Sequence, residues 1–139
     1  MTLLSLVAAG CGKDNPTSPT TTDTTTTTTV ADPAVSENFS GTLPVGGYRF
    51  YSFDVPTNGT VTATLNAVGG GPVPTTVWVG LGVGVPDGTD CPTDLSLNTQ
   101  SGEGPHISTT LAPGTHCVRV YDIGNLASPA PFAVTIGHP

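Results

Sequence analysis

The side chains of this sequence that are best suited to catalysing hydrolysis are three histidines and the serines and aspartates near them. A Ser–His–Asp triad can be assembled on paper from Ser108, His106 and Asp122. Such a triad also needs a turn that exposes the nucleophile and backbone donors that stabilise an oxyanion. The spacing of these residues provides neither feature. The sequence therefore favours ordinary polar roles for the histidines and predicts no catalytic residues.

Acidic residues gather in one segment, where Asp87, Asp90 and Asp94 are the candidates for a metal site. Calcium binds about six to eight oxygens from carboxylates and backbone carbonyls. The segment lacks the regular spacing of a known calcium loop, and turn formation explains the same residues. The sequence thus predicts no cofactor, with calcium as the alternative.

A short apolar run at the N-terminus ends in small residues and a cysteine. It spans residues 3–10, far fewer than the roughly 20 apolar residues that a transmembrane helix needs. The residues from Val7 to Cys11 resemble the lipobox of bacterial lipoproteins. This resemblance implies that residues 1–11 are a signal, that Cys11 is lipidated, and that the protein is anchored to a membrane of the bacterial envelope.

The N-terminal segment departs from the lipoprotein pattern in two places. Only Met1 and Thr2 precede the leucines, so the positive region of an export signal is absent, and Ala8 stands where the family prefers leucine. We expect a basic segment upstream of Met1, and the alternative is a frayed N-terminus with a free thiol. Gly12 follows the cysteine, which by the sorting rule of enteric bacteria favours the outer membrane, facing the periplasm or the cell surface.

Residues 12–33 form a threonine-rich segment of low complexity. Ten of the thirteen residues from Thr17 to Thr29 are threonine. A tract without apolar periodicity cannot bury enough surface to offset the entropy lost on ordering, so we expect a disordered tether. Its 22 residues would reach roughly 70 Å when fully extended. Stalks rich in Ser, Thr and Pro are also candidates for O-glycosylation.

The composition of the chain is that of a strand-and-turn domain. Charged residues make up 9% of the sequence, while 18 glycines and 14 prolines are present. Residues 34–139 are enough for one domain of about 105 residues. The net charge of −7 excludes nucleic acid as the expected partner, because binding it requires many Lys and Arg side chains.

Alternating apolar residues predict an all-β fold after the disordered N-terminal segment. Turn signals separate the apolar stretches, which is typical of an antiparallel β-sandwich. We expect a single sandwich of about seven strands, at residues 39–43, 51–55, 61–65, 77–83, 107–111, 115–122 and 132–136.

A hairpin is expected across residues 113–114, with Leu111 opposite His116 and Ile107 opposite Val120. Directly opposed residues share a sheet face, so this register separates an apolar face from a polar one. It also places His106 and His116 on opposite faces, where they would not share a metal. The polar face would carry Cys117, Arg119, Tyr121, Ser108 and His106.

Glycines alternate in one expected strand, at Gly80, Gly82 and Gly84. Alternation within a strand is unlike a phosphate-binding loop and is typical of close packing or bending. We expect the ring of Trp78 to lie over these glycines.

Several of these segments resemble the bacterial pre-peptidase C-terminal domain. The sequences GTL at 41–43, YSFDV at 51–55 and GTVTATL at 59–65 resemble its opening strands, and residues 112–120 and 132–136 resemble its last two. The resemblance covers residues 36–137. It implies an accessory, non-catalytic β-sandwich of the kind that is usually appended to secreted proteases.

Once Cys11 is assigned to a lipid, Cys91 and Cys117 remain as a pair in an exported protein. An oxidising compartment favours a disulfide bond between them. Cys91 lies in an expected long loop from Pro86 to Gln100, so the bond would hold that loop against the sheet. The alternative is metal binding by the two cysteines, which lacks the further ligands of a tetrahedral site.

The leading functional hypothesis is a non-catalytic binding or structural module, displayed at the bacterial envelope on the threonine-rich tether. Its membrane contact would be the N-terminal lipid, and its ligand a glycan or a protein. The alternative is a small secreted hydrolase on a β-sandwich scaffold, with His106 in a pocket beside a serine and a carboxylate. Candidate ligand-facing residues are Trp78, Arg119 and Tyr121, with Tyr48 beside them.

Overall fold

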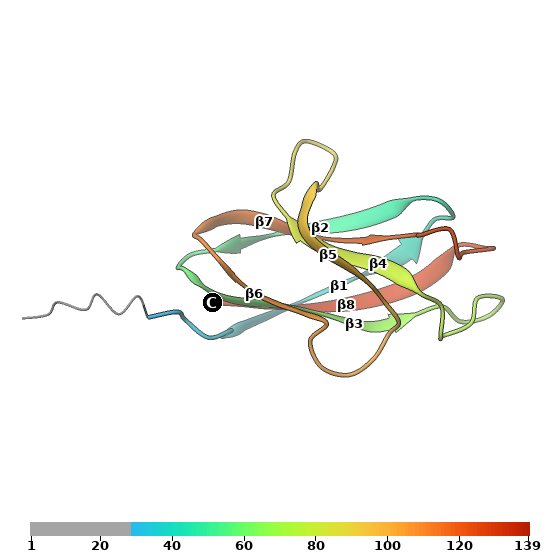
Figure 1. Ribbon diagram of the computed structural model, residues 1–139, viewed down its shortest axis with the longest axis horizontal. Coiled ribbons are helices and arrows are strands. Elements are labelled where there is room, and N and C mark those ends of the chain that lie inside the picture. Colours follow the sequence, from blue (N-terminus) through green and yellow to red (C-terminus); the bar gives the residue numbers. More distant parts are fainter. Residues whose placement is uncertain (1–28) are drawn as a thin grey trace, which may run out of the picture.

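The alternating apolar residues form eight strands and no helix in the computed structural model, which describes residues 29–139. Two four-stranded antiparallel sheets, with strand orders β1-β8-β3-β6 and β2-β7-β4-β5, face each other (Figure 1). The predicted all-β sandwich is therefore confirmed. The strands are β1 (Val35–Leu43), β2 (Tyr48–Val55), β3 (Gly59–Val68), β4 (Val79–Gly84), β5 (Thr93–Thr99), β6 (Ile107–Leu111), β7 (Gly114–Tyr121) and β8 (Ala130–His138).

The N-terminal predictions concern a part of the chain that the structure does not describe. The expected signal at residues 1–11, its lipidated Cys11 and the tether up to residue 28 lie outside the described residues. Residues 29–139 contain no helix that is long and apolar enough to cross a membrane.

The core lies between the two sheets and is built by residues with a spacing of two. In β8, for example, Phe132, Val134 and Ile136 are buried while the residues between them are partly exposed. Such alternation buries one face of each strand and leaves the other in contact with water. The core includes the buried side chains of Leu43, Phe53, Val55, Val61, Leu65, Val68, Val79, Leu81, Val83, Ile107, Val118, Val120, Phe132, Val134 and Ile136.

Strand β5 forms where a long loop was expected, so the prediction of a loop from Pro86 to Gln100 is wrong for residues 93–99. This strand lies at the edge of its sheet and pairs only with β4. Leu97 packs against the core, whereas Leu95 remains exposed. An edge strand buries few side chains, so its apolar pattern was too short to be recognised.

The expected hairpin between residues 107–111 and 115–122 is also wrong. Strand β6 pairs with β3 in one sheet, while β7 pairs with β2 and β4 in the other. Residues 112–113 therefore carry the chain from one sheet to the other. Residues expected on the apolar face are nevertheless buried, because both sheets turn their apolar sides to the same core. Ile107, Val118 and Val120 all lie in this core.

The glycines of β4 allow other groups to lie directly on the outer side of this strand. A Cβ atom at Gly80 would lie 2.1 Å from the ring of Tyr121, and one at Gly84 would lie 1.8 Å from the carbonyl oxygen of Pro92. Close packing is thus confirmed, but the ring involved is that of Tyr121. Trp78 does not cover the glycines and is half exposed.

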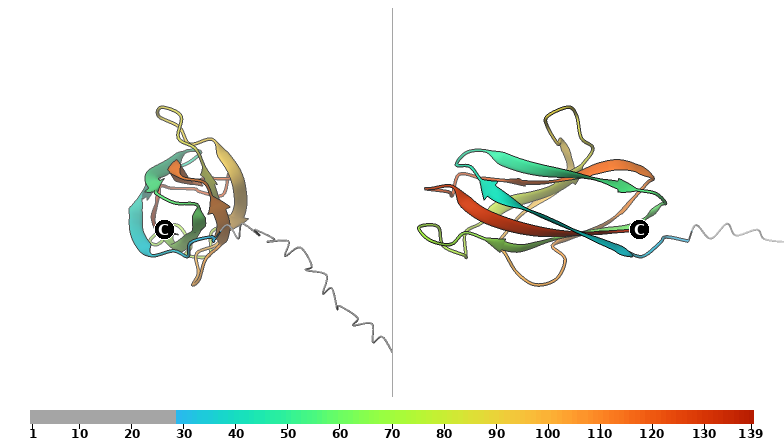
Figure 2. Two further views of the ribbon diagram at one scale, coloured as in Figure 1. Left: turned by 90° about the vertical axis from the view of Figure 1, so that its left-hand side faces the viewer. Right: turned by 180° about the vertical axis from the view of Figure 1, so that it is seen from behind.

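The chain enters the domain and ends at the same end of the sandwich. The amide of Ala34 donates to the carbonyl of His138 at 2.9 Å, and Ala31 pairs with Gly59. In Figure 2 the C-terminus lies where the chain enters the sandwich. The opposite end, here called the far end, consists of the loops at residues 44–47, 69–78 and 122–129.

We predict that Gly84→Ala destabilises the domain by about 1–3 kcal/mol, because the new methyl group must displace the backbone of Pro92. Gly102→Ala is the matched control, since its nearest neighbour would be His106 Nε2 at 3.7 Å. The control should change the free energy of unfolding by less than about 0.5 kcal/mol. Urea unfolding measures both, and equal effects of the two substitutions would contradict this packing.

Candidate functional site

The outer surface of the sheet β2-β7-β4-β5 brings together most of the predicted ligand-facing residues. Tyr48 lies opposite Tyr121, and Phe50 lies opposite Arg119, in the pairing of β2 with β7. Because opposed residues share a face, these four side chains lie on one side of the sheet. We call them the aromatic face.

Arg119 is the centre of the aromatic face. Its guanidinium carbon lies 3.9 Å from the centroid of the Tyr48 ring and 5.5 Å from that of Tyr121. Both distances are within the range of a cation–π contact. Its Nη1 also donates to a carboxylate oxygen of Asp90 at 3.2 Å. Its buried Nε has no partner in the structure, so Arg119 is held mainly by two rings and one carboxylate.

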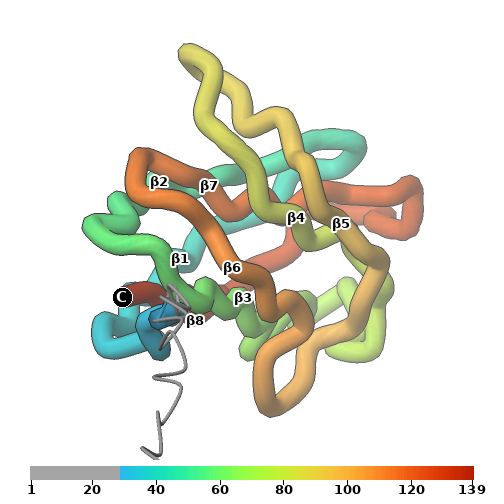
Figure 3. Tube along the Cα trace, turned by 60° about the vertical axis from the view of Figure 1, so that its left-hand side comes forward, coloured from blue at the N-terminus to red at the C-terminus, as the bar shows by residue number. Residues whose placement is uncertain are grey.

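A disulfide bond fixes the β4–β5 connection beside the aromatic face. Cys91 and Cys117 are bonded, with their Cα atoms 6.1 Å apart, which confirms the predicted pair. The hydroxyl of Tyr48 also donates to the carbonyl of Thr89 at 3.3 Å. A closed loop with the sequence separation of 26 should add about 3.5 kcal/mol of stability in the chain-entropy model. Figure 3 shows this connection projecting from the side of the sandwich.

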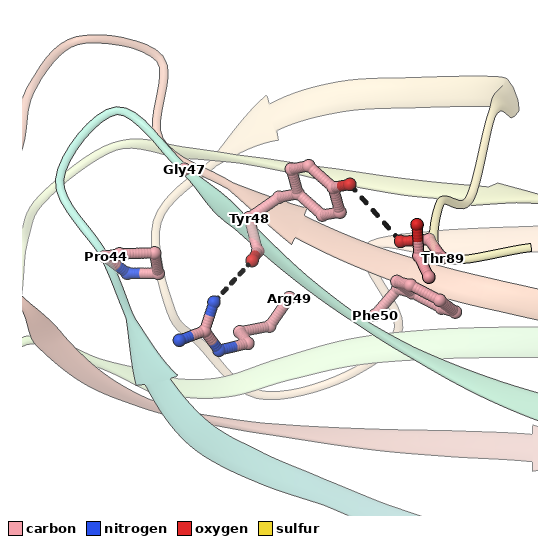
Figure 4. Close-up of a pocket in the computed structure, with 6 residues that line it drawn as sticks. All are labelled: Pro44, Gly47, Tyr48, Arg49, Phe50 and Thr89. Carbon is pink, nitrogen blue, oxygen red and sulfur yellow. Dashed lines mark hydrogen bonds between the residues drawn. The ribbon is translucent and has the colours of Figure 1, made fainter.

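An open pocket of about 440 Å³ adjoins the aromatic face. In Figure 4 the rings of Tyr48 and Phe50 lie on the Thr89 side of strand β2, and the guanidinium of Arg49 lies on the Pro44 side. The two rings are stacked with their centroids 6.5 Å apart. Arg49 Nη1 donates to the carbonyl of Tyr48 at 3.0 Å. The pocket is lined by Pro44, Gly47, Tyr48, Arg49, Phe50 and Thr89.

The structure divides the predicted ligand-facing residues between two places. Arg119 and Tyr121 lie together on the aromatic face, with Tyr48. Trp78 is exposed at the far end instead, where its carbonyl accepts a hydrogen bond from Asn125. Sequence reasoning missed Phe50 and the pocket. The pairing of β2 with β7 is the signal that finds Phe50, because it sets this residue opposite Arg119.

Of the three calcium candidates, Asp90 has its carboxylate engaged in other contacts. Asp90 binds Arg119 and also accepts from the amide of Cys91 at 2.7 Å. Asp87 pairs with Asp90 through the backbone, and Asp94 is exposed on β5. Within residues 29–139 no group of three or more His, Cys, Asp or Glu side chains is arranged to hold a metal ion.

The residues of the triad drawn on paper have separate partners. His106 Nδ1 accepts from the amide of Leu65 at 3.1 Å, and Ser108 is exposed on β6. The Asp122 carboxylate accepts four backbone N–H groups of the far-end loops, from Gly46, Gly124, Asn125 and Leu126.

His138 is the one buried histidine among residues 29–139, with only 5% of it exposed. Its Nε2 lies 2.8 Å from a carboxylate oxygen of Glu37, whose other oxygen accepts from the Tyr51 hydroxyl. Its ring also stacks on Phe53, with centroids 5.4 Å apart. Glu37 and His138 belong to one sheet and Tyr51 to the other, so this cluster ties the two sheets together.

The contacts of this cluster shift two pKa values. The hydrogen bonds from Tyr51 and then His138 hold the pKa of Glu37 below its usual value of 4.5. The same bond to Glu37 raises the pKa of Tyr51 above its usual value. Both shifts follow from stabilising the carboxylate and the neutral phenol.

A scan against models of known protein families finds no match to this chain, and a search of the curated proteins finds no match either. The reading of the site therefore depends on its own geometry.

We predict that Glu37→Gln makes the stability of the domain less sensitive to acid. A lowered pKa in the folded state stabilises the fold above the unfolded pKa, and this contribution is lost as the pH falls through the folded pKa. The variant should be less stable at pH 7 and should lose less stability between pH 5 and 3 than the parent chain. Urea unfolding over this range measures the effect, with Glu103→Gln at an exposed position as the control. Parallel curves for the parent and the Glu37 variant would contradict the network.

Proposed function

We propose that the protein is a non-catalytic binding module, anchored through Cys11 to the bacterial envelope and displayed on its threonine-rich tether. The outer membrane is the proposed site of attachment. The observation that carries the proposal is the aromatic face, in which Arg119 lies in contact with two tyrosine rings beside an open pocket.

Preorganisation supports a role in recognition. The disulfide of Cys91, the ion pair of Arg119 and the Tyr48–Thr89 hydrogen bond all fix the same surface. A surface that is already ordered loses little entropy when a ligand binds, so more of the contact energy contributes to affinity.

A glycan is the ligand class that this surface supports best. The neighbouring rings of Tyr48 and Phe50 present flat apolar area, and the Tyr48 hydroxyl adds a polar edge, which matches the face of a sugar ring. Arg49 has one hydrogen bond among the described contacts and keeps further N–H donors for an anionic group. The only arginines of the chain, Arg49 and Arg119, both lie here, so we propose an acidic glycan.

A protein that adds a strand to the edge of β2 is a less suitable ligand. Arg49 already occupies the carbonyl of Tyr48 on this edge strand, and a charged side chain on an edge discourages strand addition.

The resemblance of residues 36–137 to pre-peptidase C-terminal domains supports the same proposal. Those domains are accessory β-sandwiches without catalytic groups, and the two antiparallel sheets of this chain agree with that architecture.

We predict that Phe50→Ala lowers glycan affinity about fivefold, because stacking on an aromatic ring contributes about 1 kcal/mol. Affinity electrophoresis of the full chain in gels with polygalacturonate or dextran measures binding. Val85→Ser is the control, since it removes an exposed apolar side chain that does not line the pocket. Retention by the acidic polymer that Phe50→Ala reduces about fivefold and Val85→Ser preserves would support the proposal. Retention by neither polymer would contradict it.

A further inference from the structure

Three exposed apolar side chains gather at the far end of the sandwich, opposite the entry of the tether. Val45 is 51% exposed, Trp78 50% and Ile123 36%. Each belongs to a different far-end loop, and in Figure 1 these loops lie together at the end away from the C-terminus. We call these three residues the apolar tip.

Asp122 and Asn125 hold the three loops of the tip together. One oxygen of Asp122 accepts from Gly46 in the first loop at 2.8 Å, and the other accepts from three amides of its own loop. The side chain of Asn125 donates to the carbonyl of Trp78 in the remaining loop at 3.1 Å. These hydrogen bonds therefore fix the backbone of the loops that carry the exposed apolar side chains.

The tip carries almost no free charge. Asp122 is the only charged side chain in residues 44–47, 69–78 and 122–129. Four backbone N–H groups surround its carboxylate, so moving it toward an apolar medium loses less solvation than for a free carboxylate. The tip has the polarity of a surface that can enter the boundary of a bilayer.

We propose that the apolar tip inserts Val45, Trp78 and Ile123 into the interfacial region of a lipid bilayer. Tryptophan is favoured at this depth because its ring is apolar with one polar N–H. Val45 and Ile123 add aliphatic surface, which suits acyl chains and not the stacking of sugars. A stable protein interface takes roughly 20–30 residues from each partner. Three side chains are far fewer, so a protein is a less suitable occupant of the tip.

Charge selects the kind of lipid. Both arginines of residues 29–139 lie at the aromatic face and its pocket, and none lies in the far-end loops, so the tip offers no cation to anionic headgroups. The matching surface is zwitterionic, and its binding is insensitive to salt. The predicted tether, at roughly 70 Å extended, is longer than a nine-residue strand such as β1 at about 30 Å, so the tip can turn toward the membrane that holds the anchor.

Trp78 is the single tryptophan of the chain, so its emission reports on the tip alone. The test uses the full chain carrying Cys11→Ser, which has no attached lipid, with phosphatidylcholine vesicles that contain brominated acyl chains. We expect a blue shift of the Trp78 emission and quenching by bromine. Val45→Asp with Ile123→Asp should weaken partitioning at least tenfold, because the apolar contact is lost. Val85→Asp should leave it unchanged.

Circular dichroism checks that the variants are folded, and Val45→Ser with Ile123→Ser replaces the aspartates if they are not. Sedimentation with vesicles without a change in Trp78 emission would place the contact in the N-terminal segment and overturn the proposal. An emission shift produced by a neutral oligosaccharide, or by raising the protein concentration without lipid, would also overturn it. Quenching that survives the double substitution would do the same.

Discussion

The missing side chains on the outer side of β4 are the constraint on which the rest of the structure depends. The ring of Tyr121 packs on Gly80, and the carbonyl of Pro92 packs on Gly84. A Cβ atom at either glycine would collide with these groups. Gly84 also lies opposite Cys117 on β7. The β4–β5 connection therefore approaches β7 closely enough for Cys91 to bond to Cys117. A bulky residue on β4 would lift this connection, separate Asp90 from Arg119 and remove the order of the aromatic face.

The sandwich divides its surface into regions with different chemistry. At the end where the chain enters the sandwich, hydrogen bonds among Glu37, Tyr51 and His138 join the two sheets. The aromatic face lies on the side of one sheet, and the apolar tip lies at the far end. Under our proposals, ligand binding and membrane contact use separate surfaces, so a tethered domain can do both without competition between them.

Alternating apolar residues predict most strands of this structure. The sequence does not show which strands pair with each other or which side chains are in contact. The alternation of apolar residues identifies seven of the eight strands. Strand β5 lies at a sheet edge and buries too few side chains for its apolar pattern to be recognised. Alternation also does not tell which strand lies beside another, so a hairpin is expected across residues 113–114, whereas residues 112–113 carry the chain to the other sheet. The cysteine pair follows from chemistry alone. The burial of His138 and the position of Phe50 require the pairing of strands, and no local pattern contains that information.

Binding by a preorganised surface requires the aromatic face and the β4–β5 connection to be ordered before a ligand binds. Backbone ¹⁵N relaxation of the free, oxidised protein tests this order most directly at the amides of Thr89, Asp90 and Cys91, which the disulfide, the ion pair and Tyr48 hold in place. We expect order parameters of about 0.85, as in a rigid backbone. Values below about 0.6 for these amides, with rigid values in β7, would show that the surface is not ordered in the free protein and would contradict its preorganisation.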